Sequence, residues 1–305
     1  MDKPVELTSH DVVARVRHIL HERRIGHTGT LDPFATGVLV LLLGKATRLA
    51  QFLSGEDKEY DAIIRLGYST DTGDRTGKRI DGPTSTEAAT GEHPFGEKQI
   101  EEALASLRGW IDQVPPMYSA KKRDGKKLYE LARQGKEVDR EPVRVCIHEF
   151  TAIKADGQLI KDNLDGTFDF RARVVCSSGT YVRTLAEDFG KRLSVGAHLA
   201  ELRRTRVGDF NVEDATTLDE LRTSFAEEAL GSLLVPPGAA LSKLPFVHLS
   251  AQDVRNVSHG REVKVEGSDW VDGENVKMCD EQERLIAIGR YNAAAQALRP
   301  HVVLT

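Results

Sequence analysis

The 305-residue chain is predicted to be an α+β protein with a smaller second domain at its C-terminal end. Segments with a two-residue apolar period and segments with a helical period are mixed along the chain, without the strict strand–helix alternation of a doubly wound sheet. Pro236, Pro237 and Gly238 then interrupt the chain. Because domains average roughly 150 residues, the length also favours two of them. We therefore expect one domain over residues 1–235 and a second over 245–305.

The first elements follow from apolar periodicity. Ser9 is expected to begin a helix, because the apolar residues after it recur with helical spacing. The uninterrupted apolar run 37–43 predicts a buried strand, and residues 45–53 predict a short helix. From Tyr60 to Leu66, apolar residues recur at every second position, which is typical of a strand with one buried face.

The rest of the larger domain continues this mixture. Residues 67–94 are rich in Gly, Thr, Asp and Pro and are expected to form a loop. Helical spacing predicts a helix from about residue 97 to Trp110. A strand is expected over 168–176, a helix over 180–192, and a returning strand over 202–210. In the smaller domain the apolar segments are short, so we expect it to be β-rich, in the manner of a small barrel.

The net charge of −5, from 42 Lys+Arg and 47 Asp+Glu, is by itself unusual for a nucleic-acid-binding protein. Its distribution is uneven, however. Residues 119–144 carry nine basic and five acidic side chains, a net charge of +4. Residues 213–234 carry six acidic side chains against Arg222, a net charge of −5. The average therefore conceals a basic segment that is suited to binding phosphates.

Several classes of protein are excluded by composition. The cysteines Cys146, Cys176 and Cys279 are odd in number and widely spaced, so we expect no disulfide framework and a reducing compartment. The longest apolar run is far shorter than the ~20 residues of a membrane helix. The N-terminus has no apolar signal core, so a cytoplasmic protein that does not interact with membranes is expected.

The segment from Gly26 to Leu39 is the most unusual in the chain, with three glycines, a histidine, three threonines and an Asp-Pro step between a helix and an apolar run. One interpretation is a connecting loop, in which Asp32 initiates a turn before Pro33. The other is a carboxylate held at the end of a buried strand, where desolvation and a cationic partner adjust its pKa. Spacing alone does not decide between them.

Two other motifs are rejected. Gly73–Lys78 has one residue too few between its glycines for a phosphate-binding loop, and Arg79 stands where Ser or Thr is needed. His18 and His21 lie three residues apart on a predicted helix, but no third ligand lies nearby in the sequence, so no metal site is expected.

Three further segments combine basic and aromatic residues or cluster cations. Residues 117–129 interleave five cations with two tyrosines, a pattern found on solvated surface loops and on surfaces that bind phosphates and stack bases. Tyr181 and Arg183 begin the helix after the strand 168–176, either as a capped helix start or as site residues. Residues 202–206 form a short basic cluster whose role is ambiguous.

Together these segments resemble one family. GHTGTLDPFATGVL (26–39), RLGYSTDTGD (65–74), MYSAKKRDGKKLYELARQG (117–135), CSSGTYVRTLAEDFG (176–190) and GAHLAELRR (196–204) are similar to the motifs of the bacterial tRNA pseudouridine-55 synthases, the TruB family, in order and approximate spacing. The resemblance covers residues 2–210 well and the C-terminal domain loosely. It implies a pseudouridine synthase fold, with a central mixed, largely antiparallel sheet flanked by helices and loops, and a small C-terminal β-rich PUA-like domain.

The resemblance also implies an activity. The family isomerises uridine 55 in the T-loop of tRNA: the N1 glycosidic bond breaks, the base turns, and C5 bonds to the sugar. The aspartate attacks C1′, adds to C6 of the base, or removes a sugar proton to give a glycal, and the sequence does not choose among these. No cofactor or metal is expected.

Site residues follow by matching motifs. The resemblance implies that Asp32 is the catalytic aspartate, that Arg183 pairs with it, and that Tyr60 stacks on the uracil and assists loss of the C5 proton. Tyr181 and Leu202 match residues of the uridine pocket. The remaining residues expected to bind RNA are His27, Lys3 and the lysines of a thumb-like loop over about 117–144, namely Lys121, Lys122, Lys126 and Lys127.

One departure concerns the N-terminus. Family members usually have a short apolar strand before Asp-Lys-Pro, which this sequence lacks before Asp2-Lys3-Pro4. We therefore expect a shortened and less stable sheet edge, or a start that is internal to the gene.

The expected partner is the T-stem-loop of tRNA, and we expect a monomer that needs no protein partner. Two alternatives remain open: a tRNA-folding chaperone that does not require chemistry, and a guide-dependent relative that works inside a ribonucleoprotein.

Overall fold

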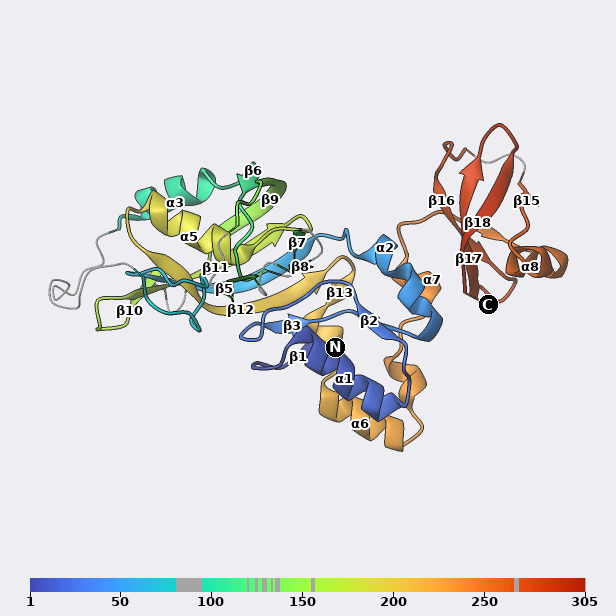
Figure 1. Cartoon of the computed structure of the whole chain (residues 1–305), viewed down its shortest axis with the longest axis horizontal. Helices are drawn as coiled ribbons and strands as arrows, with labels where there is room; N and C mark the ends of the chain where they lie inside the picture. The colour runs from blue at the N-terminus through green and yellow to red at the C-terminus, as the bar shows by residue number, and fades with distance from the viewer. Residues whose placement is uncertain are drawn as a thin grey trace. The chain divides into compact units, whose positions relative to one another are not determined.

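The computed structural model describes residues 1–80, 95–119, 121–123, 126–127, 131–132, 134, 138–154, 157–265 and 269–304. The chain forms two compact units that are interleaved in sequence (Figure 1). The first comprises Met1–His10, Thr30–Leu39 and Gly55–Ala215, and the second Asp11–Gly29, Val40–Ser54 and Thr216–Thr305. The domain limits predicted from the sequence, 1–235 and 245–305, remain a prediction.

The first unit is built on a mixed sheet. In the described residues its strands follow the order β1 (Asp2–Lys3), β3 (Thr36–Val38), β12 (Ala197–Val207), β5 (Lys58–Leu66), β11 (Phe168–Cys176), β9 (Val143–Ala152) and β6 (Gly109–Gln113). Two short strands extend it: β10 (Ile160–Asp162) pairs with β11, and β13 (Phe210–Asn211) pairs with β12. Every strand pairing of this sheet is antiparallel except that of β3 with β12. The predicted α+β class and the largely antiparallel sheet are confirmed.

One face of this sheet carries the core. On β5 the side chains of Tyr60, Ala62, Ile64 and Leu66 are buried, as the alternation predicted. Helices α5 (Val182–Arg192) and α3 (Glu97–Ala105) lie on the same side of the sheet (Figure 1). The core that they enclose includes aromatic residues of β11 and α5.

The predicted strand 37–43 was wrong in one respect. The run divides into β3, in the large sheet, and β4 (Leu41–Leu43), which pairs with β2 (Ile25–His27). Gly37 makes this possible, because its φ of 100° favours glycine and its Cα faces the backbone of Arg204.

The predicted helix 97–110 ends earlier than expected. Helix α3 stops at Ala105, Gly109 follows with a φ of 81°, and Trp110 lies on edge strand β6 with 64% of its surface exposed. Strand β9, which pairs with β6, was not predicted. The returning strand expected over 202–210 begins earlier, as β12 at Ala197.

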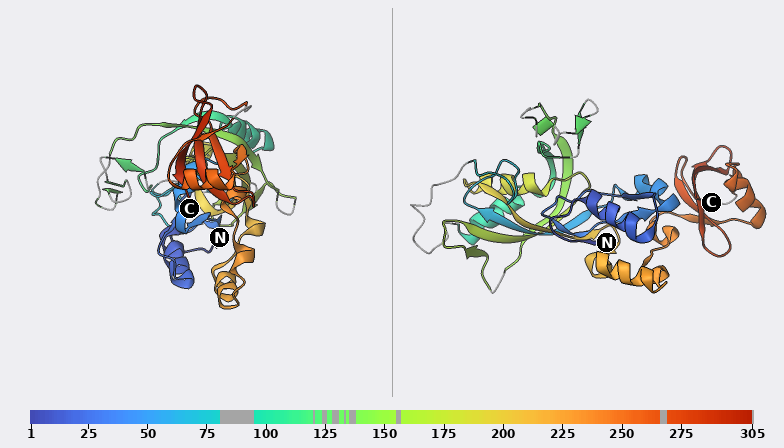
Figure 2. Two further views of the ribbon diagram at one scale, coloured as in Figure 1. Left: turned by 90° about the vertical axis from the view of Figure 1, so that its right-hand side faces the viewer. Right: turned by 60° about the horizontal axis from the view of Figure 1, so that its bottom comes forward.

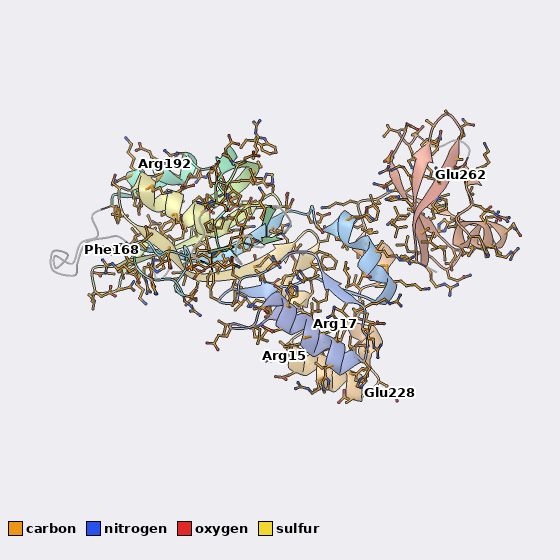
Figure 3. The ribbon with its side chains drawn as sticks, viewed as in Figure 1. Arg15, Arg17, Phe168, Arg192, Glu228 and Glu262 are labelled. Carbon is orange, nitrogen blue, oxygen red and sulfur yellow. The ribbon has the colours of Figure 1, made fainter. Side chains whose placement is uncertain are left out.

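The second unit contains helices and two further sheets. Helix α1 (Ser9–Leu20), which begins at Ser9 as predicted, runs into this unit, and the predicted helix 45–53 consists of η1 (Gly44–Leu49) and α2 (Ala50–Leu53). Helix α6 (Leu218–Ala226) has a capping box between Thr217 and Glu220. A short 3-10 helix, η3 (Leu230–Leu233), and a short α-helix, α7 (Pro237–Ala240), follow. Figure 3 shows Arg15 and Arg17 on α1 and Glu228 after α6.

The C-terminal part is β-rich, as predicted. In the described residues a sheet has the order β14 (Phe246–His248), β16 (Asn275–Cys279), β17 (Leu285–Asn292), β18 (Ala297–Val303) and β15 (Val263–Lys264). Helix α8 (Ala251–Ser258) packs beside it (Figure 2). Buried residues of the central strands, including Val276, Met278, Ala287 and Leu298, form its core.

Two short elements complete the description. Strands β7 (Lys122–Arg123) and β8 (Lys126–Lys127) pair with each other in the predicted thumb-like loop, and η2 (Val212–Asp214) follows β13. In the part of the chain that is described, none of the helices has the length and apolar character needed to cross a bilayer.

Candidate active site

Asp32 and Arg183, which are 151 positions apart in the sequence, form an ion pair. Arg183 Nε lies 3.0 Å from Asp32 Oδ2, and Nη2 donates to Oδ1 at 3.3 Å. This is the two-point geometry that a planar guanidinium makes with a carboxylate. Arg183 is buried in the first turn of α5, whereas 34% of the Asp32 side chain is exposed. The carboxylate is therefore held from one side and accessible from the other.

Arg183 also fixes two loops around Asp32. Its Nη1 donates to the carbonyl of Thr72 at 2.8 Å, and its Nη2 donates to the carbonyl of Tyr118 at 2.7 Å. Asp74 Oδ2 lies 3.8 Å from Nη1. Asp74 in turn accepts hydrogen bonds from the hydroxyls of Thr72 and Thr76. One buried guanidinium thus joins α5 to the loops that contain Thr72 and Tyr118.

The backbone next to Asp32 is held by three buried side chains. The Ser9 hydroxyl accepts from the Leu31 N–H at 2.9 Å and donates to the Leu31 carbonyl at 3.1 Å. Lys3 Nζ donates to the Pro33 carbonyl at 3.2 Å. Arg204 Nη1 donates to the carbonyl of Thr30 at 3.5 Å. The position of Asp32 is therefore set by elements on both sides of it, as a preorganised site requires.

Burial raises the pKa of Asp32 above the ordinary aspartate value. The positive charges of Arg183 and Lys3 act against this, and the negative charge of Asp74 adds to it. The protein surrounding the carboxylate therefore disfavours its charge even though part of it reaches solvent. Asp32 takes up its proton at a higher pH than a solvated aspartate does.

Tyr60 lies on β5, on the face that carries the core, and is buried. Burial raises the pKa of its hydroxyl. Arg204 on β12 hydrogen-bonds to Tyr60, and its Nε also donates to the Val38 carbonyl at 2.7 Å. Only 2% of Arg204 is exposed. This one side chain therefore connects Tyr60, strand β3 and the segment before Asp32.

Tyr181 immediately precedes α5, and its backbone is held by the side-chain amide of Gln113. Gln113 Oε1 accepts from the Tyr181 N–H at 2.9 Å, and Gln113 Nε2 donates to the Tyr181 carbonyl at 3.3 Å. Gln113 is 1% exposed at the end of β6. The amide therefore fixes the start of the helix that carries Arg183.

The remaining predicted residues fall into different surroundings. Lys3 is fully buried, and its Nζ donates to three carbonyls, including that of Leu7 at 2.6 Å, so it has the surroundings of a structural lysine. Leu202 packs in the same core as Tyr60. His27 lies on β2 in the second unit, where its Nδ1 accepts from the Gly29 N–H at 3.3 Å.

The predicted thumb lysines are only partly described. Lys121 is exposed. The backbone of Lys122, Lys126 and Lys127 forms β7 and β8, and their side chains lie outside the described residues. The RNA-binding role of the four lysines stays a prediction.

No group of His, Cys, Asp and Glu suited to holding a metal ion occurs among the residues that the structure describes. His18 and His21 contact each other edge to face, with ring centroids 6.4 Å apart, and His21 packs on Phe225 at 5.8 Å.

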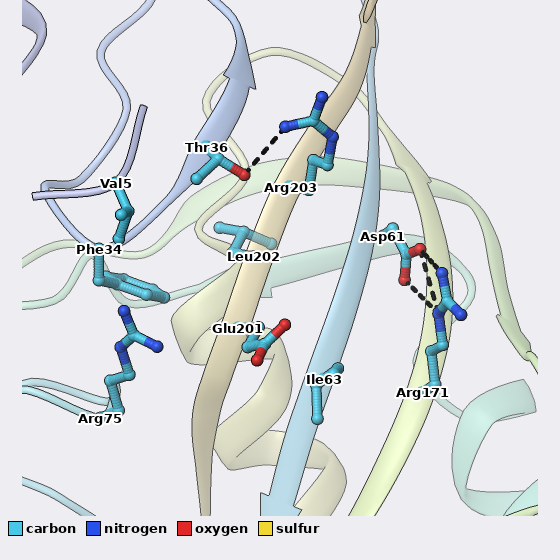
Figure 4. A pocket seen from close by; sticks show the side chains of 10 residues that line it. All are labelled: Val5, Phe34, Thr36, Asp61, Ile63, Arg75, Arg171, Glu201, Leu202 and Arg203. Carbon is cyan, nitrogen blue, oxygen red and sulfur yellow. Dashed lines mark hydrogen bonds and ion pairs between the residues drawn. The ribbon is translucent and has the colours of Figure 1, made fainter. Parts of the chain in front are cut away.

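A groove of about 500 Å³ opens on the first unit (Figure 4). Asp61, Ile63 and Arg171 line it, with Asp61 and Arg171 paired across β5 and β11. These residues alternate along their strands with Tyr60, Ala62 and Ala172, so they lie on the opposite face of the sheet. Phe34 and Leu202 also line the groove, and Leu202 is one of the residues predicted for the uridine pocket.

The arrangement around Asp32 is suited to chemistry by a carboxylate. An accessible Asp32, oriented by a guanidinium, can attack an electrophilic carbon or remove a proton. Arg204, Gln113 and Asp74 were not predicted as site residues. Arg204 belonged to the ambiguous basic cluster 202–206. For Gln113 the sequence offered one signal. It is a polar residue at the end of a short segment that two prolines follow closely.

Comparison with known proteins gives consistent matches. A family model described as TruB family pseudouridylate synthase (N terminal domain) matches residues 17–182. A model of the tRNA pseudouridylate synthase B C-terminal domain matches 183–242, and one of the pseudouridine synthase II TruB C-terminal region matches 245–304.

Curated relatives carry the name tRNA pseudouridine synthase B. That of Aromatoleum aromaticum is 48% identical over 261 residues, 86% of this chain and 79% of the relative. That of Thermobifida fusca is 46% identical over 268 residues, 88% and 86% of the two chains. That of Bacillus anthracis is 40% identical over 289 residues, 94% and 90% of the two chains.

Solved structures share the fold. A chain from the crystal structure of a Cbf5-Nop10-Gar1 complex superimposes with a TM-score of 0.71 at 28% identity, over 100% of this chain and 83% of the other. A chain from an H/ACA RNP bound to a substrate RNA containing 2′-deoxyuridine gives a TM-score of 0.71 at 26% identity, over 100% and 83% of the two chains. These matches agree with the predicted fold class.

Proposed function

Because the chain belongs to the TruB family of pseudouridylate synthases, we propose that it isomerises uridine to pseudouridine in tRNA, at position 55 of the T-loop. The observation that carries the proposal is an accessible Asp32 held in two-point contact by the buried Arg183. This carboxylate lies in the segment that matches the family's catalytic motif. The curated relatives that bear the enzyme's name extend over most of the chain.

In the proposed reaction Asp32 acts as an ionised carboxylate on the flipped uridine. The bond between N1 and C1′ breaks, the base turns within the pocket, C5 bonds to C1′, and the C5 proton leaves. Asp32 takes part by attacking C1′, by adding to C6, or by removing a sugar proton. Arg183 orients it, because the guanidinium stays charged and its planar fork fits a carboxylate. None of these steps requires electron transfer or phosphoryl transfer.

The target uridine has to leave its stack to reach Asp32. Extruding a base costs a few kcal/mol, and stacking on an aromatic side chain returns ~1–3 kcal/mol per base. We assign the stacking in the pocket to Tyr60, with Tyr181 and Leu202 lining it and His27 contacting the T-loop. Tyr60 also assists loss of the C5 proton. Residues 1–235 would form the catalytic domain and residues 245–305 a PUA-like domain.

Replacing Asp32 by Asn tests the assignment of the catalytic residue. We expect Asp32→Asn to abolish pseudouridine formation in an unmodified tRNA transcript, because the amide has no carboxylate to donate electrons or accept a proton. The affinity for the T-stem-loop should stay within a few-fold. Pseudouridine is mapped by position, and affinity is measured by filter binding. Asp188→Asn, at a partly exposed aspartate that pairs with Lys191 on α5, is the matched control. Isomerisation by Asp32→Asn at the normal rate would contradict the assignment.

A bare T-stem-loop tests whether the enzyme acts alone. We propose a monomer that works in the cytoplasm without a guide RNA or protein partner. The purified chain should form pseudouridine in the isolated stem-loop. Activity only after addition of a guide ribonucleoprotein would instead support the guide-dependent alternative, and a gain in tRNA folding that Asp32→Asn retains would support the chaperone alternative alongside the enzyme.

A further inference from the structure

A second cluster of reactive side chains lies on the first unit, and the proposed isomerisation does not use it. Cys146 and His148 are two residues apart on β9, so their side chains share one face of the strand. The Cys146 Sγ lies 3.6 Å from His148 Nδ1. His148 Nε2 lies 3.3 Å from Asp57 Oδ2, on the loop before β5. The imidazole of His148 therefore lies between the thiol of Cys146 and the carboxylate of Asp57.

The carboxylate sets the state of the imidazole. A neutral histidine carries one ring proton, and the nitrogen that faces a carboxylate holds it. With Asp57 at Nε2, the proton resides there and Nδ1 presents its lone pair to the thiol. This is the arrangement in which a histidine acts as the base for a cysteine nucleophile, and the third group orients the base.

The thiol is both fixed and accessible. The Cys146 N–H donates to Ser177 Oγ at 2.9 Å, and the Cys146 carbonyl accepts from the Ser177 N–H at 2.8 Å. Cys146 itself is half-buried, and 44% of the His148 side chain is exposed. A small molecule can therefore approach the sulfur while the backbone holds it next to its base.

The neighbouring strand positions add two charged side chains and one aromatic ring to the surroundings of the thiol. Arg144 precedes Cys146 on the same face of β9, and Asp112 faces Arg144 from β6. Trp110 lies opposite Cys146 in the register, with the Arg144 guanidinium 5.4 Å from its ring. The site is a short polar strip beside the edge strand β6, with one aromatic wall.

We propose that Cys146 is a reactive thiol that exchanges with low-molecular-weight disulfides, with His148 as its base and Asp57 as the group that orients His148. His148 Nδ1 takes the proton of Cys146 as the sulfur attacks one sulfur of the disulfide. A new S–S bond forms to Cys146 while the S–S bond of the small molecule breaks. The departing thiolate takes the proton from His148. Cys146 is thereby oxidised and one half of the small disulfide is reduced to a thiol.

The other two cysteines are suited to serve as internal references. Cys176 is buried, and burial raises its pKa to about 11. Cys279 is also buried, and burial raises its pKa. Since the thiolate is the nucleophile, both react slowly near neutral pH. Modification should therefore be confined to Cys146 in the native protein.

The test uses the full chain and glutathione disulfide, without RNA, so that it is independent of the proposed isomerisation. The mixed disulfide is located and timed by mass spectrometry of peptides. We expect Cys146 to be modified first, and His148→Gln to slow this at least about tenfold, since general bases contribute 10²–10⁴-fold. His301→Gln, at an exposed histidine elsewhere, should leave the rate unchanged.

Asp57 is tested as a positioning residue by a double substitution. Asp57→Asn should slow the reaction in the wild-type background, and it should have no further effect in the His148→Gln background, because its contribution passes through His148. Equal rates for His148→Gln and wild type would overturn the proposal. So would modification of Cys176 or Cys279 as fast as Cys146 in the folded protein, or an additive effect of Asp57→Asn.

Discussion

At the residue scale, the site depends on buried polar side chains that hold other residues in place. A buried charge is costly unless its hydrogen-bonding groups have partners, so a buried arginine is expected where it fixes a geometry. Arg204 fits this description, because it contacts Tyr60 and the carbonyls of Val38 and Thr30. Gln113 does the same for the backbone of Tyr181 without any charge.

Arg204→Met should therefore affect both stability and activity. Removing the guanidinium leaves buried carbonyls without a donor, so we expect a loss of about 3 kcal/mol in the free energy of unfolding. We also expect kcat to fall more than KM rises, because Tyr60 and the Asp32 segment lose their common anchor. Urea unfolding and steady-state kinetics measure the two effects. Arg192→Met, at an exposed arginine at the end of α5, is the control, and an equal loss in both variants would count against the anchoring role.

The pH dependence of activity follows from the raised pKa of Asp32. As the pH falls through that pKa, Asp32 takes up a proton and the reaction loses its carboxylate. The acid limb of kcat/KM should therefore lie above the pH expected for an ordinary aspartate. Because Asp74 raises the pKa of Asp32, Asp74→Asn should move the limb to lower pH. A limb that stays in place or moves to higher pH in this variant would show that Asp32 is not the group being titrated.

The sequence predicted the chemistry of Asp32 only through its resemblance to a family. Its spacing alone did not distinguish a catalytic residue from a turn, because the partner, Arg183, is 151 positions away and no local pattern connects the two. The alternation around Tyr60 correctly predicted which face of β5 is buried. Arg204 and Gln113 were missed because a buried polar residue with a long-range partner resembles a surface residue in the sequence.

At the element scale, the pairing of β3 with β12 depends on Gly37. A Cβ built there would overlap the carbonyl oxygen of Arg204, and the φ of 100° is unfavourable for any other residue. Gly37→Ala should therefore lower the free energy of unfolding by about 3 kcal/mol or more, as measured by urea unfolding. Gly55→Ala, where a Cβ would meet nothing within 4 Å, should change it little. A small effect at Gly37 would mean that the two strands can move apart.

The same residue explains why one predicted element was wrong. An apolar run of seven residues is compatible with a single strand, and the sequence shows no charge within 37–43 to divide it. The division comes from tertiary contacts, since β3 pairs with β12 and β4 pairs with β2. Trp110 was placed on a helix for a similar reason: its apolar spacing continued the pattern of α3, and the positive φ of Gly109 ended it.

At the scale of the whole molecule, net charge is a poor guide to the partner. The chain is acidic overall, with a net charge of −5, yet residues 213–234 account for −5 by themselves. In the second unit, Arg15 and Arg17 project from α1, while Glu228 follows α6 (Figure 3). An RNA encounters local charge, because screening limits exposed charges to about 10 Å at 0.1 M salt. The basic segment 119–144 can therefore bind phosphates on an acidic protein.

The local charge of this segment predicts how affinity depends on salt. Replacing Lys121, Lys122, Lys126 and Lys127 by Gln should weaken binding of the T-stem-loop and make it less salt-dependent. The slope of log K against log salt should become shallower by roughly 0.7–0.9 for each phosphate that no longer meets a lysine. Filter binding between about 50 and 200 mM salt covers the range in which phosphate binding by lysines changes affinity most.

A matched variant separates local from net charge. Neutralising four exposed lysines elsewhere on the first unit removes the same total charge, and these are Lys98, Lys154, Lys161 and Lys191. If net charge governed binding, both quadruple variants would show the same slope. If the segment 119–144 clasps the RNA, only the first variant has a shallower slope, because counterions are released only where lysines meet phosphates. An unchanged affinity and slope in the first variant would remove the thumb-like loop from the RNA-binding surface and leave the Asp32 assignment intact.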